Sequence, residues 1–446
     1  MGRTPQTTRC SDALRGYRTY VEELRALVVD AARDGRSPNV GDSVLAALDG
    51  QAAENLRRLV PLETLRRDGI FLTGSELAQR AVQHLLPTLD ARSVILDPTC
   101  GAGDLLLACV GALPLRPSLS QTLRAWEGQL VGRDLHSELL EAARQRLLLA
   151  AIQRFPGSRI SRRTLDRPLF PRIRMGCGLS DVNYEDATHL VMNPPFTMAP
   201  AHEPCEWASG QVNSAAVFLE HALRRTRPGT RIAAILPEVL RSGSRYRKWR
   251  QLVERLARID RLEVGEQFNR WTDIHVFVLS LCVRERPATS SERADTWNRP
   301  TGESRLGDRF AVRIGPVVDY RDPHEGGEHP FIRSRDLPPW GTLFRISRTR
   351  RFSGKLMAPP FIAVRRTSRP GDPCRAIGTL VLGEIPVAVE NHVICLIPHR
   401  GERPRCRAAL QNLRDPQSTE WLDQRIRCRH LTVGALAELP WWSEGS

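Results

Sequence analysis

The turn Asn193-Pro194-Pro195-Phe196 combines groups that could bind a planar molecule bearing an amino group. It follows the apolar residues 190–192, which are typical of a buried strand, and its two prolines end strand pairing and restrict the backbone. The Asn193 amide oxygen and the Pro194 carbonyl can each accept an N–H bond, while the Phe196 ring can stack on a planar ring. The alternative interpretation is a proline-stiffened loop that holds no ligand.

A second stretch that could do chemistry is the turn Asp97-Pro98-Thr99-Cys100-Gly101-Ala102-Gly103-Asp104, called the glycine turn below. It lies between a predicted strand and a predicted helix. Gly101 and Gly103 let the backbone approach a ligand closely, and the start of the helix offers free N–H groups. Such turns bind nucleotide-like cofactors, although a tight turn without a ligand is the alternative.

Asp134 ends the next predicted strand, residues 129–134. A carboxylate at this place can accept hydrogen bonds from both hydroxyl groups of a ribose. Taken alone, Asp134 could equally be the N-cap of the following helix. The nearby glycine turn favours the ribose role.

The elements that would position these turns alternate between strands and helices over residues 71–283. Strand patterns occupy residues 94–96, 129–134, 172–177, 188–193, 231–237, 259–264 and 275–283. Helical patterns occupy residues 105–110, 136–151, 215–225 and 246–257. This alternation predicts an α/β fold with a mostly parallel sheet covered on both faces. Ligands bind such sheets outside the carboxyl ends of the strands, where both turns would lie.

The flanking segments have other patterns. Apolar residues at helical spacing between residues 11 and 66 predict an N-terminal helical segment, residues 1–70, that packs on the next domain or on a partner. Residues 284–306 are rich in Thr, Ser, Arg and Pro, which is typical of a linker. Short apolar runs between Gly and Pro turns predict a second, β-rich domain over residues 307–446.

The 446-residue chain has a formal net charge of +15, which is typical of a protein that binds a polyanion such as DNA or RNA. Lys248 and Lys355 are the only lysines, so a coding bias toward Arg is an alternative source of part of this charge. The densest basic cluster predicts either a phosphate-contacting helix or a solvated one. It consists of Arg241, Arg245, Arg247, Lys248 and Arg250, with Tyr246 and Trp249 interleaved.

The ten cysteines form no Cys-x-x-Cys pair, which argues against a zinc ribbon and a redox dithiol; we expect no metal site. They are scattered among apolar runs, as expected of reduced, buried thiols in a cytoplasmic protein. Residues 1–10 lack the apolar region of a signal peptide, and no run approaches about 18 uninterrupted apolar residues. We therefore expect neither a signal peptide nor a membrane span.

Together, these motifs resemble those of a known enzyme family. Phe71-Leu72-Thr73-Gly74, the glycine turn, Asp134 and the turn Asn193-Pro194-Pro195-Phe196, in this order, are similar to the amino-methylating DNA methyltransferases. The similarity is greatest to the N6-adenine-specific group of type I and type II restriction–modification systems, and it covers roughly residues 70–283.

The resemblance implies a Rossmann-like methyltransferase fold, with a mostly parallel seven-stranded sheet over residues 71–283 and a C-terminal α+β domain similar to target-recognition domains. It also implies S-adenosylmethionine as cofactor and double-stranded DNA, with a flipped adenine, as substrate. A specificity or restriction subunit is an implied partner.

The resemblance further implies roles for individual residues. Asn193 and Pro194 would hold the adenine amino group, Pro195 would complete the catalytic turn, and Phe196 would stack on the flipped base. The implied cofactor-binding residues are Phe71, Thr73, Asp97, Gly101, Gly103, Asp134 and Cys177.

The sequence departs from the family's pattern at several positions. Cys177 stands where the family often has an Asp that contacts the cofactor adenine, and Asp181 and Asp186 are the candidate substitutes. His189 stands near the place where an acid often precedes the catalytic strand, and the first motif is loosened to Phe71-Leu72-Thr73-Gly74. These departures bear on cofactor affinity more than on the class of reaction.

Two further segments are candidate DNA contacts. Residues 197–211 would form a loop that closes over the flipped base, with His202 and Trp207 facing the DNA. In the C-terminal domain, Arg365, Arg366 and Arg369 could reach phosphates or guanine edges. For both sets, exposed side chains without such a role are the alternative.

Other functions are compatible with the same motifs. Methyltransferases that modify a protein glutamine or an RNA guanine amino group share the Asn-Pro-Pro-aromatic turn, but the long C-terminal domain and the basic charge favour DNA. A non-catalytic DNA-binding or assembly subunit with the same fold is another alternative. We expect no nuclease in this chain, because neither Lys248 nor Lys355 follows an acid at the required spacing.

Overall fold

A computed structural model of the protein describes residues 14–34, 38–156, 160, 167–202, 204–269, 272–289, 297, 304–399 and 403–442. The chain divides into two compact units, one of residues 1–240 and 247–294 and the other of residues 241–246 and 295–446. Most of the predicted linker, residues 290–296 and 298–303, lies outside the described residues. The four-part division of the chain stays a prediction.

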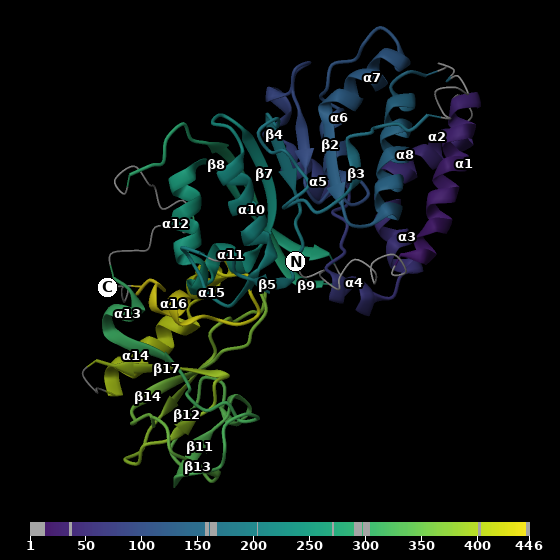
Figure 1. The fold of residues 1–446 in the computed structure, drawn as a ribbon. Coiled ribbons are helices and arrows are strands. Elements are labelled where there is room, and N and C mark those ends of the chain that lie inside the picture. Colours follow the sequence, from purple (N-terminus) through teal and green to yellow (C-terminus); the bar gives the residue numbers. More distant parts are fainter. Residues whose placement is uncertain are drawn as a thin grey trace, which may run out of the picture. The chain divides into compact units, whose positions relative to one another are not determined.

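The first unit is built on a seven-stranded sheet with the strand order β3-β2-β1-β4-β7-β9-β8 (Figure 1). Neighbouring strands are parallel from β3 to β7, and β9 is antiparallel to both β7 and β8. All residues of β1 and β4 are buried, as expected of apolar strands covered on both faces. The predicted Rossmann-like fold with a mostly parallel sheet is confirmed. The strands are β1 (Ile95–Asp97), β2 (Leu130–Asp134), β3 (Ile173–Met175), β4 (His189–Met192), β7 (Arg231–Pro237), β8 (Ala257–Asn269) and β9 (Thr272–Val283).

Helices follow the parallel strands of this sheet, in the alternation that the sequence predicts. Helix α8 contacts β2 and β3, and α6 contacts β1 and β4; α10 and α12 contact each other and the strands β7 and β8 respectively. The helix α7, which begins at the N-cap Ser118, is an addition that the sequence pattern does not predict. The helices are α5 (Ser75–Val82), α6 (Asp104–Val110), α7 (Leu119–Gln129), α8 (Ser137–Gln153), α10 (Ser214–Arg225), α11 (Glu238–Ser242) and α12 (Arg247–Leu256).

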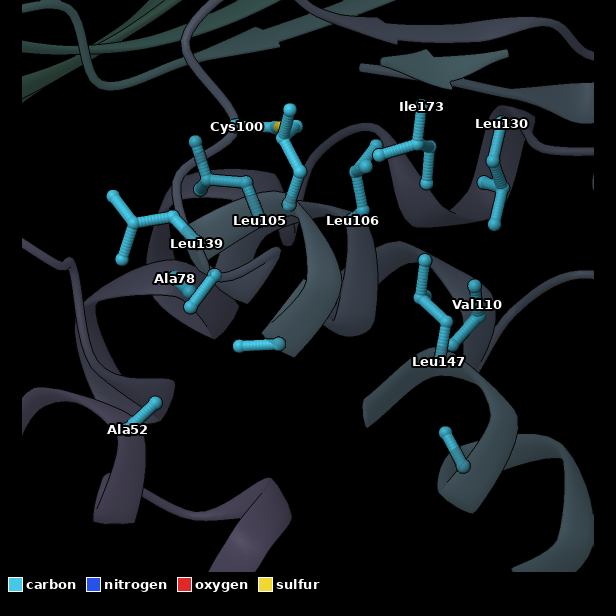
Figure 2. Close-up of a cluster of buried hydrophobic side chains, with 14 of the residues drawn as sticks. Ala52, Ala78, Cys100, Leu105, Leu106, Val110, Leu130, Leu139, Leu147 and Ile173 are labelled. Atoms are coloured by element: carbon cyan, nitrogen blue, oxygen red, sulfur yellow. The ribbon is translucent and has the colours of Figure 1, made fainter. Parts of the chain in front are cut away.

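The N-terminal helices share a hydrophobic core with the sheet. Helix α1 lies beside α8 (Figure 1). Figure 2 shows Ala52 and Ala78 in one cluster with Leu105 and Leu147. The predicted N-terminal helical segment therefore packs on the sheet of its own chain. Its elements are η1 (Arg15–Tyr17), α1 (Arg18–Asp34), α2 (Pro38–Leu48), α3 (Gln51–Leu59) and α4 (Leu62–Asp68).

A short hairpin follows the turn at Asn193. Strand β5 (Met198–Pro200) pairs antiparallel with β6 (Gln211–Asn213). The segment predicted as a loop over residues 197–211 thus contains two strands, each too short to show the alternation of apolar and polar residues. Trp207 within it is 4% exposed, so it does not present the exposed indole that a DNA contact requires.

The second unit is an α+β structure with its own hydrophobic cores. A five-stranded sheet has the order β10-β17-β14-β15-β12, and a three-stranded sheet has the order β13-β11-β16. The short apolar runs predicted in this segment include residues 310–314, 361–364, 379–382 and 392–397, which lie in or overlap strands, and residues 316–318, which form only an isolated bridge at Val317. These elements are α13 (Leu306–Arg309), β10 (Phe310–Ile314), β11 (Gly327–Ile332), β12 (Thr342–Leu343), β13 (Thr349–Phe352), β14 (Phe361–Arg365), β15 (Gly378–Val381), β16 (Ala388–Val389), β17 (Val393–Pro398), α14 (Arg403–Arg414), α15 (Pro416–Arg425) and α16 (Val433–Ala437).

The basic cluster of residues 241–250 does not form a single exposed face. Arg241 is 2% exposed and donates to the main-chain carbonyls of Gln424 and Arg425. Arg250 is also buried, and Trp249 is fully buried. A helix that contacts phosphate with all five basic residues is therefore excluded.

The cysteines in the described part of the chain are all free thiols. Cys100, Cys109, Cys395 and Cys406 are buried. None of the helices in that part is both long enough and apolar enough to cross a membrane.

Candidate active site

The turn Asn193-Pro194-Pro195-Phe196 begins where β4 ends, at the carboxyl end of the central parallel strands. Pro194 is buried, whereas Asn193, Pro195 and Phe196 are half-buried. The Asn193 side-chain nitrogen, Nδ2, donates a hydrogen bond to Thr73 Oγ1 over 2.9 Å. Thr73 lies 120 residues earlier in the chain, so the fold alone brings these two side chains together.

The glycine turn lies at the carboxyl end of the neighbouring strand β1. The Gly101 amide donates to Asp134 Oδ2 over 3.1 Å, which joins the glycine turn to the end of β2. Gly101 has a φ of +49°, and a Cβ placed on it would lie 2.8 Å from Leu72 Cδ2. A larger residue would therefore crowd the wall formed by Leu72.

Asp134 is anchored on both of its carboxylate oxygens. Oδ1 accepts from the His136 backbone N–H over 2.9 Å and lies 3.0 Å from His136 Nδ1, while Oδ2 accepts from Gly101. A carboxylate has about four acceptor positions, so Oδ2 retains capacity for one more donor. The N-cap of α8 is His136, so the alternative that Asp134 caps this helix is wrong; its carboxylate holds the residue before the helix and remains available to a ligand.

Asp97 lies behind the glycine turn and is only 1% exposed. Its Oδ1 accepts from the Thr99 backbone N–H over 3.0 Å. Burial, together with the nearby carboxylates of Asp134 and Asp104, raises the pKa of Asp97 to about 8 against the lowering by the Thr99 hydrogen bond. The hydrogen bond from Thr99 ties Asp97 to the turn and stabilises its shape.

A cavity lies between these turns, and its empty volume, open mouth included, is about 650 Å³. Six of the residues implied by the resemblance line it: Phe71, Gly101, Asp134, Cys177, Asn193 and Pro195. Thr73, Asp97, Gly103, Pro194 and Phe196 are not among the lining residues, and they support the wall from behind or from beside it.

Cys177 stands at the edge of this cavity, and no carboxylate replaces it there. Asp181 Oδ2 instead accepts from the Cys177 backbone N–H over 2.6 Å. Asp181 and Asp186 both line a different hollow, beside Arg133 and Arg174. Neither candidate substitute for the missing acid is among the residues that line the cavity.

Phe196 belongs to a small aromatic cluster with two rings from distant parts of the chain. Its ring packs edge-on against Phe268, with centroids 5.6 Å apart, and Phe268 packs edge-on against Phe71 at 6.5 Å. Phe268 lies in β8, near the end of a strand, and nothing in its local sequence indicates this place.

The segment after the catalytic turn is held by a buried acid on α10. Glu220, which is 1% exposed, accepts from Trp207 Nε1 over 2.6 Å and lies 2.9 Å from His202 Nε2. Its other oxygen accepts from Arg224 Nε over 2.9 Å. With Cys205, His202 and Glu220 also form a group of side chains close enough to hold a metal ion. Both carboxylate oxygens of Glu220 are already bonded to donors, so we assign this group to anchoring the segment.

Comparison with known proteins identifies the first unit. Residues 50–263 match the family model described as N-6 DNA methylase. These residues belong to the N-6 DNA methylase family. The match contains the Phe71 motif, the glycine turn, Asp134 and the Asn193 turn, which are the residues on which the resemblance rests. None of the curated proteins compared with the chain matches it.

Solved structures with a similar fold come from restriction–modification systems. The type IIL restriction-modification enzyme MmeI in complex with DNA is 12% identical and matches 87% of this chain and 70% of its own, with a TM-score of 0.54. The type IIG restriction endonuclease BpuSI is 13% identical over 98% of this chain and 70% of its own, with a TM-score of 0.45.

A modification subunit of a putative type I restriction enzyme from Vibrio vulnificus YJ016 is 18% identical over 53% of this chain, with a TM-score of 0.37. The present chain spans about half the length of that subunit. At these identities the likeness shows the fold alone.

The methylase cavity has lining residues that the sequence motifs did not identify. Asp68, Leu135, His136 and Phe218 all line it. Leu135 and His136 directly follow Asp134, and Leu135 is 56% exposed although it is apolar. An apolar residue directly after Asp134, the acid that ends β2, is the signal that could have identified Leu135.

The lining of the methylase cavity fits a ligand that contains a nucleoside. Asp134 provides an acceptor for a sugar, Leu135 and Phe218 provide apolar surface for a base, and the glycine turn brings backbone close to the ligand. A Cβ on Gly178 would lie 2.1 Å from the Pro98 carbonyl oxygen, so this part of the rim also requires glycine. S-adenosylmethionine meets each of these requirements.

Proposed function

We propose that this protein transfers a methyl group from S-adenosylmethionine to the N6 amino group of adenine in double-stranded DNA, in a restriction–modification or phage-defence system. The observation that carries the proposal is that Asn193 of the amide turn and Asp134 and Gly101 of the cofactor motifs line one cavity. The family of residues 50–263 supports methyl transfer to DNA.

In the proposed reaction, bound S-adenosylmethionine supplies a methyl group activated by its sulfonium. Phe71, Gly101, Asp134 and Cys177 line the cofactor's part of the cavity, while Thr73, Asp97 and Gly103 hold the shape of its wall. The adenine leaves the duplex at a cost of roughly a few kcal/mol, because a stacked base cannot reach such a cavity.

Asn193 Oδ1 and the Pro194 carbonyl then accept the two hydrogens of the adenine amino group. This favours a pyramidal nitrogen, whose lone pair is no longer delocalised into the ring. The new bond joins this nitrogen to the methyl carbon, the carbon–sulfur bond breaks, and the surplus proton leaves the nitrogen after transfer. Phe196 holds the base by stacking, and Pro195 keeps the turn in shape.

We also propose that residues 307–446 recognise the DNA target, with a specificity or restriction subunit as partner. The α+β architecture of the second unit and its basic residues support this assignment. Arg365 and Arg366 donate to the main-chain carbonyls of Leu337 and Asn391, and these bonds leave their positive charge uncompensated.

The test incubates the protein with methyl-labelled S-adenosylmethionine and, separately, plasmid DNA, ribosomal RNA and a release factor. Label in DNA, together with N6-methyladenine at a defined motif in long-read sequencing of DNA from expressing cells, is the expected result. Label only in RNA or protein, or no cofactor binding at high micromolar concentration in calorimetry, would contradict the proposal.

We predict that Asn193→Ala lowers the rate of methylation by at least about 100-fold, because one of the two acceptors of the amino group is lost. Affinity for DNA should be retained. Asn183→Ala, an exposed asparagine outside the cavity, is the matched control and should keep wild-type activity. Unchanged turnover in the Asn193 variant would overturn the catalytic assignment.

A further inference from the structure

Residues 69–74, called the strap below, connect α4 to α5 and contact both turns of the site. Leu72 lies against Gly101 of the glycine turn, and Thr73 bonds to Asn193 of the catalytic turn. The Gly74 backbone N–H donates to Asp104 Oδ2 over 2.9 Å. The strap therefore connects the proposed cofactor wall directly to the amide that is proposed to hold the adenine.

The contact at Thr73 holds one end of the Asn193 amide. An asparagine side chain has a donor end, Nδ2, and an acceptor end, Oδ1, and only the acceptor end can receive an N–H of adenine. In the structure Nδ2 donates to Thr73 Oγ1 over 2.9 Å. This bond occupies the donor end and leaves Oδ1 as the end available to the amino group. A reversed amide would turn its donor end, Nδ2, toward the amino group of adenine, so that two donors would meet there.

The position of Thr73 is itself fixed by a buried ion pair one residue away. Asp104 Oδ2 accepts from the Gly74 N–H, and its Oδ1 accepts from Arg146 Nη1 over 2.7 Å. Asp104 is 7% exposed and Arg146 is 1% exposed. Gly74 has a φ of +76°, which favours glycine, so the chain direction at this point is closely restricted. The hydroxyl of Thr73 is therefore held in place before a substrate binds.

We propose that Thr73 is a positioning residue that holds the Asn193 amide with its oxygen toward the target amino group. This role rests on the proposed adenine methylation. It differs from the cofactor contact that the resemblance implies for Thr73, because Thr73 is not among the residues that line the cavity. Loss of its hydroxyl should slow the chemical step and leave the affinity for S-adenosylmethionine unchanged.

The test compares Thr73→Val, which keeps the shape but removes the hydroxyl, with Thr73→Ser, which keeps the hydroxyl. Steady-state kinetics on target DNA and calorimetry with S-adenosylmethionine are measured for both. We expect Thr73→Val to lower kcat about tenfold or more with less than a twofold change in cofactor Kd, and Thr73→Ser to retain most of the activity. Thermal unfolding identifies a misfolded variant, in which case Thr73→Ala replaces Thr73→Val.

Two outcomes would overturn the inference while the proposed function stands: wild-type kcat in Thr73→Val, or a parallel loss of kcat and cofactor affinity in that variant. If the wild-type protein methylates no DNA, the proposed function fails instead. The side-chain amide can then still be examined by NMR, with the Asn193 signal assigned through Asn193→Ala. A signal that is identical in wild type and Thr73→Val would contradict the hydrogen bond itself.

Discussion

His189 illustrates how a residue's environment, and not its type, decides its role. It is the first residue of β4, at the opposite end of the strand from Asn193, and it is 6% exposed. Its two ring nitrogens lie 2.8 and 2.9 Å from the hydroxyls of Thr188 and Thr88. Burial, and then the charge of Arg231, lower the pKa of His189 to about 4. A residue that departs from the family's acidic pattern is thus a neutral, hydrogen-bonded part of the core.

We predict that acid destabilises the protein partly through His189. The ring stays neutral in the folded protein down to about pH 4, whereas in the unfolded chain it gains a proton below its usual pKa of about 6.5. The stability that it contributes is therefore complete above about pH 6.5 and is lost as the pH falls toward 4. His189→Gln should reduce the fall in Tm between pH 7 and pH 5, as measured by thermal unfolding.

The exposed His84 provides the control for this prediction. His84→Gln should leave the dependence of Tm on pH as in the wild type. An equal fall in Tm for the wild type and the His189 variant would show that other groups, such as the buried His221, whose pKa burial also lowers to about 4, dominate the acid response.

At the scale of elements, a buried arginine joins the N-terminal helices to the methylase sheet. Arg146 on α8 donates to the Ala47 carbonyl at the end of α2, to the Ala102 carbonyl in the glycine turn and to Asp104. Two of these partners belong to the glycine turn and the third to α2, so one guanidinium ties the glycine turn to α2 and to α8. This contact gives the N-terminal helical segment a direct part in shaping the wall of the cavity.

We predict that Arg146→Met destabilises the protein by about 3–5 kcal/mol, because it leaves Asp104 buried without its partner. Urea unfolding of the wild type and the variant measures the change in the free energy of unfolding. Addition of Asp104→Asn to this variant should restore part of the loss, since the uncompensated charge is then removed.

Arg144→Met, on the same helix, is the matched control. Arg144 is 28% exposed, pairs with Glu141 and donates to the Ile173 carbonyl, and its loss leaves no fully buried charge, so it should cost less, about 1–2 kcal/mol. Equal destabilisation by the two substitutions would show that the Arg146–Asp104 pair stabilises the fold no more than the contacts of Arg144 do.

At the scale of the whole molecule, the charge is distributed less evenly than the net +15 suggests. Several arginines are buried on main-chain carbonyls, among them Arg241 and Arg250, and these cannot contact DNA. Others, such as Arg369, are exposed. The number of phosphates that the protein can neutralise is therefore smaller than its arginine count.

We predict that DNA affinity falls by about 1,000-fold or more between roughly 50 and roughly 200 mM salt if about six or more phosphates are contacted. Binding titrations at several salt concentrations give the slope of log affinity against log salt. Arg369→Ala should reduce this slope by about one unit, as expected for the loss of one phosphate contact.

Arg33→Ala, an exposed arginine on the N-terminal helix α1, should leave the slope as in the wild type. A slope in the Arg369 variant equal to that of the wild type would exclude Arg369 from the DNA interface. An equal reduction in both variants would indicate general electrostatic attraction without a defined contact.

Local sequence patterns were sufficient for most of the first unit. The strand predicted over residues 231–237 has the bounds of β7, and the strand and helix patterns around the glycine turn lie within two residues of β1, α6, β2 and α8. Continuous apolar runs identify strands buried on both faces, and breakers such as Gly101 and Pro194 mark their ends. The order of the motifs also indicated the family. Each motif is a short run of consecutive residues, so it can be recognised without knowledge of the fold.

What the tertiary structure decided was the set of partners between distant residues. The bond between Thr73 and Asn193 spans 120 residues, and the Phe71, Phe196 and Phe268 cluster brings three segments together. The same holds for the burial of Arg146 and for the absence of Asp181 from the residues that line the cavity. Periodicity reports which face of an element is buried but not which side chain of another element meets it. For this protein, the sequence alone determined the methylase motifs and the sheet that carries them, and only the packing of the strap brought the Thr73 hydroxyl to the Asn193 amide.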